Sequence, residues 1–73
     1  MYKVTRQLNG ELRCNVECKI CNSSFEFIDD KNGFAIVKNI NVVNGKNESM
    51  TLDITAKCNI CGYRTVYHGE LEL

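Results

Sequence analysis

The sequence predicts a small all-β fold of about six short antiparallel strands with no substantial helix. Short runs rich in β-branched and aromatic residues alternate with Asn-Gly dipeptides, which are strong turn signals between strands. No segment shows helical periodicity over three turns. Four of the five cysteines form two C-x-x-C pairs, a pattern that predicts a metal ion that stabilises a small fold.

The expected strands follow one another along the chain with turns between them. Three dipeptides, Asn9-Gly10, Asn32-Gly33 and Asn44-Gly45, each lie between two β-rich runs and predict hairpins. Alternation of apolar residues is clearest from Leu52 through Ile54 to Ala56. The six predicted strands span residues 2–8, 11–17, 24–29, 34–43, 49–57 and 63–68.

Length and composition set the limits of the fold. A chain of 73 residues has room for one small domain, which we expect to span residues 1–73. Nine basic residues balance nine acidic ones, and the 44% hydrophobic content is ordinary for a soluble globular protein. The longest apolar run, residues 34–37, is too short for a transmembrane helix or a signal peptide, so no membrane association is expected.

The paired cysteines predict one tetrahedral metal site per chain. The ligands are expected to be Cys18, Cys21, Cys58 and Cys61, because two matched C-x-x-C turns can present four thiolates to one ion. Asn22 and Gly62, which follow the two pairs, are the residue types that best tolerate the positive φ of such a turn. Zinc is the expected ion, iron is less favoured, and disulfides fit an odd cysteine count poorly. Thiolate ligands indicate a reducing compartment, so a cytoplasmic location is expected.

An internal repeat accounts for the fifth cysteine. A shift of 40 residues aligns Cys18 with Cys58 and Phe27 with Tyr67, and it places Cys14 on Ile54. A free cysteine behaves as a small buried hydrophobe, so Cys14 is expected in the core. A redox thiol and a substitute ligand are the alternatives.

The repeat also suggests an arrangement for the two halves. We expect two hairpins that face each other tip to tip across the ion, with the run 34–43 passing both. The alternative is a break in that run near Lys38-Asn39. The run 2–8 is the expected edge strand, open to a partner strand.

The two knuckles, C-K-I-C-N and C-N-I-C-G-Y, resemble those of the zinc-ribbon superfamily. The resemblance covers the four cysteines and their flanking strands, and it implies that these cysteines are the zinc ligands. Proteins of this kind include RNA polymerase subunits, transcript-cleavage factors, ribosomal proteins and regulators that bind polymerase or sigma factors. Cleavage factors carry an acidic pair at a hairpin tip, but Asp29-Asp30 here precedes Lys31-Asn32-Gly33 and predicts an ordinary turn.

Rubredoxins, which are iron electron carriers, offer a second resemblance through Cys58-x-x-Cys61-Gly62-Tyr63. In rubredoxins this knuckle comes first, the gap between the knuckles is shorter, and Trp- and Pro-containing acidic segments surround the site. This chain has none of these features, so an iron carrier is the less favoured alternative.

The metal site disfavours enzyme activity, and the net charge disfavours nucleic-acid binding as the main function. A four-cysteine site has no open coordination position, and His68 is expected to be a solvated strand-end residue, so no enzyme activity is expected. Four thiolates and one Zn²⁺ change the net charge from 0 to −2 (0 − 4 + 2), which disfavours nucleic-acid binding as the main function. We therefore expect a small adaptor or regulator that acts through protein contacts, with RNA polymerase or an associated factor as the favoured partner. The abundance of Asn, Ile and Lys suggests an AT-rich genome and a phage- or prophage-type regulator. A homodimer is left open.

Overall fold

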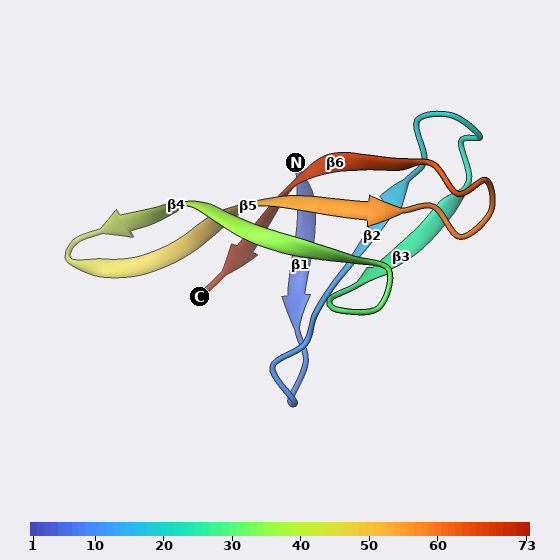
Figure 1. The fold of residues 1–73 in the computed structure, drawn as a ribbon. Helices are drawn as coiled ribbons and strands as arrows, with labels where there is room; N and C mark the ends of the chain where they lie inside the picture. The colour runs from blue at the N-terminus through green and yellow to red at the C-terminus, as the bar shows by residue number, and fades with distance from the viewer.

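The computed structural model describes all residues from Met1 to Leu73 and is all-β, as predicted. Six strands form a single sheet, and the chain forms no helix that could cross a membrane (Figure 1). The strands are β1 (Tyr2–Arg6), β2 (Leu12–Glu17), β3 (Ser24–Ile28), β4 (Gly33–Val43), β5 (Lys46–Lys57) and β6 (Arg64–Glu72).

The strand order, β3-β2-β1-β6-β5-β4, differs from the expected arrangement of facing hairpins. Two hairpins, β2–β3 and β5–β6, flank β1, which pairs antiparallel with β2 and parallel with β6. Because of that one parallel pair, β2 and β5 run in the same direction, and the knuckles that follow them lie at the same end of one sheet. The prediction that all pairs are antiparallel is wrong for β1 and β6.

The edge strands of the sheet also differ from expectation. The first strand, expected at an edge, lies at the centre, and the real edge strands are β3 and β4. The sheet is rolled, so that these two edges meet at one point, where Asp29 forms an isolated bridge with Gly33. The alternative of a break in the long run is partly realised, because the pairing of β4 with β5 shifts register between Val37 and Asn39 while the strand continues.

The turns explain which Asn-Gly signals form hairpins. Asn44 and Gly45 both have positive φ (53° and 77°) and connect β4 to β5 in the expected way. Gly10, with φ of 87°, closes the β1–β2 turn, where its N–H donates to the Gln7 carbonyl at 2.9 Å. Both hairpin predictions are confirmed.

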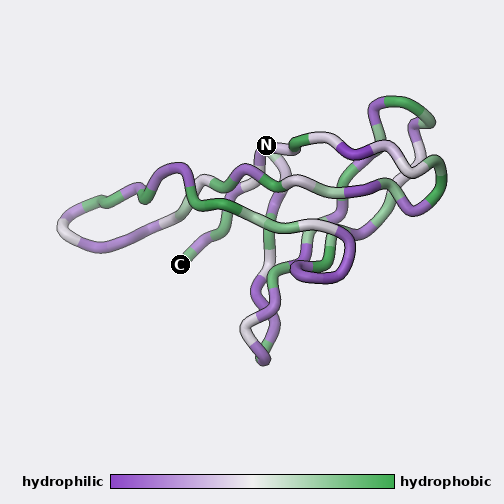
Figure 2. The backbone as a smooth tube through the Cα atoms, in the orientation of Figure 1, coloured by the Kyte–Doolittle hydropathy of each residue, from purple (hydrophilic) through white to green (hydrophobic).

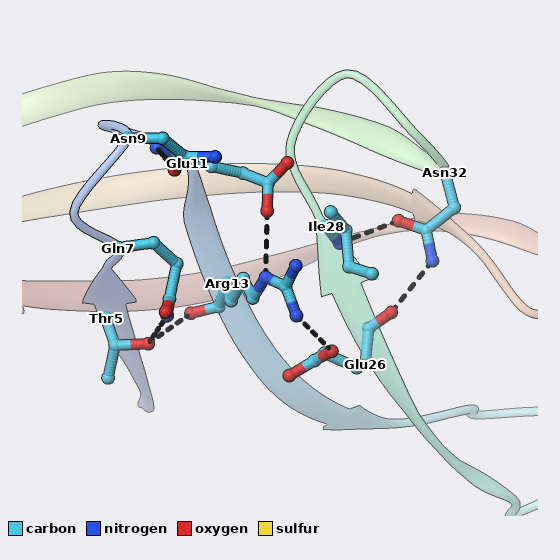
Figure 3. Close-up of polar contacts among 8 residues, drawn as sticks. All are labelled: Thr5, Gln7, Asn9, Glu11, Arg13, Glu26, Ile28 and Asn32. Atoms are coloured by element: carbon cyan, nitrogen blue, oxygen red, sulfur yellow. Dashed lines mark hydrogen bonds and ion pairs between the residues drawn. The ribbon is translucent and has the colours of Figure 1, made fainter.

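Asn32-Gly33, in contrast, does not form a hairpin, because β3 and β4 do not pair with each other. The Asn32 side chain closes a turn instead: its Oδ1 accepts from the Ile28 N–H and its Nδ2 donates to the Glu26 carbonyl, both at 2.8 Å (Figure 3). The Asn32 carbonyl then accepts from the Lys57 N–H at 2.9 Å. The turn thus carries the chain from one edge of the sheet to the other.

The core lies on the inner face of the rolled sheet and follows the predicted repeat. Phe27 and Tyr67, which the repeat aligns, are 0% and 1% exposed. Cys14 and Ile54, also aligned, are 3% and 0% exposed, so the prediction that Cys14 belongs to the core is confirmed. The buried set comprises Val4, Cys14, Val16, Cys18, Phe25, Phe27, Leu52, Ile54, Ala56, Cys58, Tyr67 and Leu71.

Candidate metal centre

Each knuckle is a tight turn built by the same backbone hydrogen bonds. In the first, the Cys18 N–H donates to the Ser23 carbonyl at 2.9 Å and the Asn22 N–H donates to the Cys18 carbonyl at 3.0 Å. In the second, the Cys58 N–H donates to the Tyr63 carbonyl at 2.9 Å and the Gly62 N–H to the Cys58 carbonyl at 3.1 Å. The sequence repeat is therefore also a repeat of local structure.

The residues after the two cysteine pairs have the predicted backbone conformation. Asn22 has φ of 60° and Gly62 has φ of 79°. This left-handed conformation reverses the chain after the second cysteine of each pair, and it is open to Asn and Gly at little cost.

The two knuckles bring four cysteine sulfurs together. The Sγ atoms of Cys18, Cys21, Cys58 and Cys61 lie within 4.8 Å of one another, and none of these residues forms a disulfide. Two of the contacts join different knuckles: Cys18 Sγ lies 3.5 Å from Cys61 Sγ, and Cys21 Sγ lies 3.7 Å from Cys58 Sγ.

These distances fit a tetrahedral thiolate site. Four sulfurs at about 2.3 Å from a central zinc are separated by about 3.8 Å at the corners of a regular tetrahedron. The observed separations lie near that value and well above the roughly 2.05 Å of a disulfide bond. The four cysteines could therefore hold a single metal ion. When bound, the ion would link the β2–β3 hairpin to the β5–β6 hairpin.

Backbone donors point at the sulfurs in both knuckles. The Ile20 N–H donates to Cys18 Sγ and the Ile60 N–H donates to Cys58 Sγ, both at 3.4 Å. Such bonds stabilise thiolate over thiol. The backbone N–H groups of Cys61 and Ile60 lower the pKa of Cys58, and bonds from the Ser23 side chain and backbone lower the pKa of Cys21 to about 6.

The fourth sulfur, that of Cys61, lies in an environment that disfavours its thiolate form. The Tyr63 N–H favours the Cys61 thiolate, but desolvation and the neighbouring sulfurs outweigh this bond and raise the pKa of Cys61 to about 11. Four thiolates at this spacing repel one another, and a divalent ion removes the repulsion. The donor set is soft sulfur, which suits zinc and iron alike.

The cluster is half buried. Cys18 and Cys58 are each 1% exposed, whereas Cys61 is exposed and Cys21 is intermediate. The first cysteine of each knuckle thus belongs to the core, and the second lies at the protein surface.

Cys14 lies outside the cluster, although it is on the same strand as the first knuckle. Burial raises the pKa of its thiol, which is the opposite of the environment of a reactive cysteine.

The aromatic core is in contact with the knuckle region. Tyr67 makes edge-to-face contacts with Tyr2 and Phe25, with ring centroids 5.8 and 6.1 Å apart. Lys19, within the first knuckle, lies 5.7 Å from the centroid of the Tyr67 ring and donates to the Val66 carbonyl at 3.4 Å. This contact between the knuckle and the opposite hairpin could not be read from the sequence.

Three other residues considered for function lie away from the cysteine cluster. Asp29 and Asp30 occupy the β3–β4 turn rather than a hairpin tip, as the turn interpretation predicts. Partial burial and the charge of Asp30 raise the pKa of Asp29. Arg13 pairs with Glu11 at 2.8 Å and Glu26 at 3.3 Å (Figure 3).

His68 is exposed to solvent, as expected, but its position and its contact differ from expectation. It lies within β6 rather than at a strand end, and its Nδ1 is 3.0 Å from Asp53 Oδ1. Sequence reasoning missed Asp53, although its position opposite His68 in the β5–β6 register follows from the pairing of the two strands. Asp53 also pairs with Lys38 at 3.7 Å, so these residues form a cross-strand charge cluster on the outer face.

Comparisons with protein-family models, with curated proteins and with solved structures found no match to this chain. The metal centre therefore rests on the geometry of the cysteines themselves.

Proposed function

We propose that this chain is a small zinc-stabilised adaptor or regulator that acts through protein–protein contact in a cytoplasm, with transcription machinery as the favoured partner class. The proposal includes no enzyme activity. The observation that carries it is the pair of exposed isoleucines at the tips of the two knuckles.

Ile20 and Ile60 occupy matching positions of the repeat and are 61% and 70% exposed. Their backbone N–H groups bond to sulfurs of one cluster, so the two side chains are held on a common rigid support. Tyr63 follows the second knuckle and is also exposed. Figure 2 shows hydrophobic colour at both knuckle tips, where the chain turns at the surface. We call Ile20, Ile60 and Tyr63 the knuckle surface.

Two arguments favour a protein partner for this surface. An ion held by four cysteines is coordinatively closed, so the centre positions the surface rather than taking part in a reaction. Exposed apolar groups that lie together mark interaction sites, and tyrosine, here Tyr63, is among the residues that dominate binding energy in protein interfaces.

Charge argues against nucleic acid as the main partner. The chain has no basic excess, and a zinc-loaded site would leave it at about −2. Lys19, the basic residue within the first knuckle, already bonds to the Val66 carbonyl. The resemblance of the knuckles to zinc ribbons is the reason for favouring transcription machinery.

A capture experiment with matched variants tests this proposal. Tagged protein is incubated with nuclease-treated lysate of the host, and the bound proteins are identified by mass spectrometry. Ile20→Asp should lose the captured complex, whereas Leu8→Asp, which alters a fully exposed leucine in the β1–β2 turn, should retain it. Metal content is measured on both variants to show that the knuckles are intact.

Two results would overturn the proposal. One is a complex that is captured from untreated lysate but not from nuclease-treated lysate. The other is submicromolar oligonucleotide binding near physiological salt with a steep salt dependence, which is the behaviour of a nucleic-acid-binding ribbon.

A further inference from the structure

The β4 strand is an open edge of the sheet. It is 11 residues long, pairs with β5 on one side, and has no strand on the other (Figure 1). The backbone N–H and C=O groups on its free side are available to another strand. Six large apolar side chains of β4 are between 46% and 57% exposed: Phe34, Ile36, Val37, Ile40, Val42 and Val43.

These side chains lie on both faces of the sheet. Phe34 and Ile36 are opposite Thr55 and Asp53, on the outer face. Val37 is opposite the buried Leu52, and Ile40 is opposite Met50, which packs against the core. Val37 and Ile40 therefore lie on the inner face. A partner that packs on one face would leave the other uncovered, whereas a strand added to the edge contacts both faces at once.

The far half of the β4–β5 hairpin lacks support from the rest of the sheet. Pairing of β5 with β6 ends at Ser49 opposite Glu72, so residues 42–47 form a two-stranded arm beyond it (Figure 1). The arm contributes to the 43 Å length of a molecule that is 24 and 16 Å in its other dimensions. An isolated two-stranded ribbon is marginally stable in water, and a third strand stabilises it.

The charge of β4 permits pairing with an identical strand. Lys38 is its one charged residue, and Lys38 Nζ lies 3.7 Å from Asp53 Oδ2, within its own chain. Two copies of β4 therefore bring together few like charges. The charged side chains that usually protect an exposed edge are otherwise missing.

The other edge is a poor complement to β4. In β3 the apolar residues Phe25 and Phe27 are buried on the inner face, and Glu26 lies between them and pairs with Arg13. Pairing of β3 with β4 of another copy would set this ion pair against apolar residues and would build an open chain. Pairing of β4 with β4 matches apolar faces and closes about a two-fold axis.

We propose that two copies of this chain associate edge to edge along β4, antiparallel, so that their sheets join into one. Six half-exposed side chains offer roughly 400–500 Å² per copy, or roughly 800–1,000 Å² for the pair, at or just below the lower bound of a specific interface before the backbone is counted. This self-association uses a different surface from the knuckle surface and does not depend on the proposed function.

Sedimentation equilibrium of the metal-loaded protein, from about 1 to 300 µM, tests the proposal. The wild type should approach twice the chain mass of 8.3 kDa as concentration rises. Ile36→Lys and Ile40→Lys, which alter the two opposite faces of β4, should each shift the dissociation constant at least about tenfold toward monomer. Leu8→Lys adds the same charge at a remote exposed leucine and should not change the equilibrium. Metal content shows that each variant is folded.

Hydrogen exchange of the unaltered chain provides an independent readout. The β4 amides on the free side should exchange rapidly at low concentration and become protected at high concentration. A monomer over the whole range contradicts the proposal. A dimer sensitive to only one of the two β4 variants also contradicts it, because that result indicates stacking of one face rather than pairing of edges.

Discussion

Tyr67 and Phe27 occupy equivalent positions in the repeat. Removing the hydroxyl of Tyr67, or adding one to Phe27, tests how the core is packed. Both rings are fully buried, but the Tyr67 hydroxyl has no hydrogen-bond partner. A buried polar group without a partner costs about 1–3 kcal/mol of stability. Tyr67→Phe removes that cost and leaves a void of one oxygen atom, so we expect a net gain of about 1 kcal/mol.

The reciprocal variant provides the control. Phe27→Tyr places a hydroxyl at a position that is 0% exposed, and it should lower the free energy of unfolding by about 1–3 kcal/mol. For a domain of this size, 1 kcal/mol corresponds to a shift of roughly 4–8 °C in Tm. Tyr67→Phe should therefore raise Tm, and Phe27→Tyr should lower it.

Urea and thermal unfolding of both variants, at one fixed concentration of free zinc, measure these changes. Fixed zinc is essential because metal binding adds to the apparent stability. A Tyr67→Phe protein that is less stable than the wild type would refute the reasoning, since it would show that the hydroxyl has a partner in the metal-loaded protein.

Three substitutions and a change of pH test other parts of the structure. Cys14→Val should keep one metal per chain and most of the stability, because Cys14 is buried outside the cysteine cluster. Cys58→Ser should lose both the metal and the dispersed amide signals in NMR spectra. Loss of the metal in Cys14→Val would show that the ligands are misassigned. Gly69→Ala should lower the free energy of unfolding by about 1–3 kcal/mol in urea titrations, because a Cβ there would lie 2.6 Å from Val4 and 2.8 Å from Ile54; an unchanged midpoint would contradict this packing. Metal affinity should fall as pH falls, because protons compete for the thiolates. In the metal-free protein, bonds from Ser23 lower the pKa of Cys21 to about 6, so the stabilisation from this thiolate is present above the ordinary pKa of a thiol and is lost as pH falls through about 6. A metal dissociation constant that does not change between about pH 8 and pH 5 would contradict this.

The local structure of this chain followed closely from its sequence. Matched C-x-x-C spacing located the two turns, and the residue types of Asn22 and Gly62 predicted their positive φ values. The 40-residue repeat predicted which side chains are buried, including Cys14, because both copies of the unit direct the same positions into one core. The turns depend on neighbours in the chain, and the burial pattern depends on the alternation of apolar residues within each repeat unit.

The strand order could not be predicted in the same way. It depends on which edges meet, and nothing in the residues of β1 distinguishes a central strand from an edge strand. The parallel pairing of β1 with β6 decides that both knuckles lie at one end of the sheet. The hairpin predicted at Asn32-Gly33 is absent for a related reason. The Asn32 side chain closes a turn between strands that do not pair, and the dipeptide alone does not reveal this role.

The charge cluster on the outer face was missed for the same reason. Asp53 and His68 are distant in sequence and meet only through the register of β5 and β6. The contact between Asp53 Oδ1 and His68 Nδ1 is a hydrogen bond on the exposed outer face of the sheet.

We propose that the four clustered cysteines hold one structural zinc ion. Elemental analysis of the purified protein, combined with visible absorption and a thiol titration under denaturing conditions, tests this claim directly. We expect one zinc per chain, a colourless protein and five free thiols after denaturation in chelator. A red protein that contains iron would contradict zinc, and a metal-free protein with two disulfides would contradict the metal centre itself.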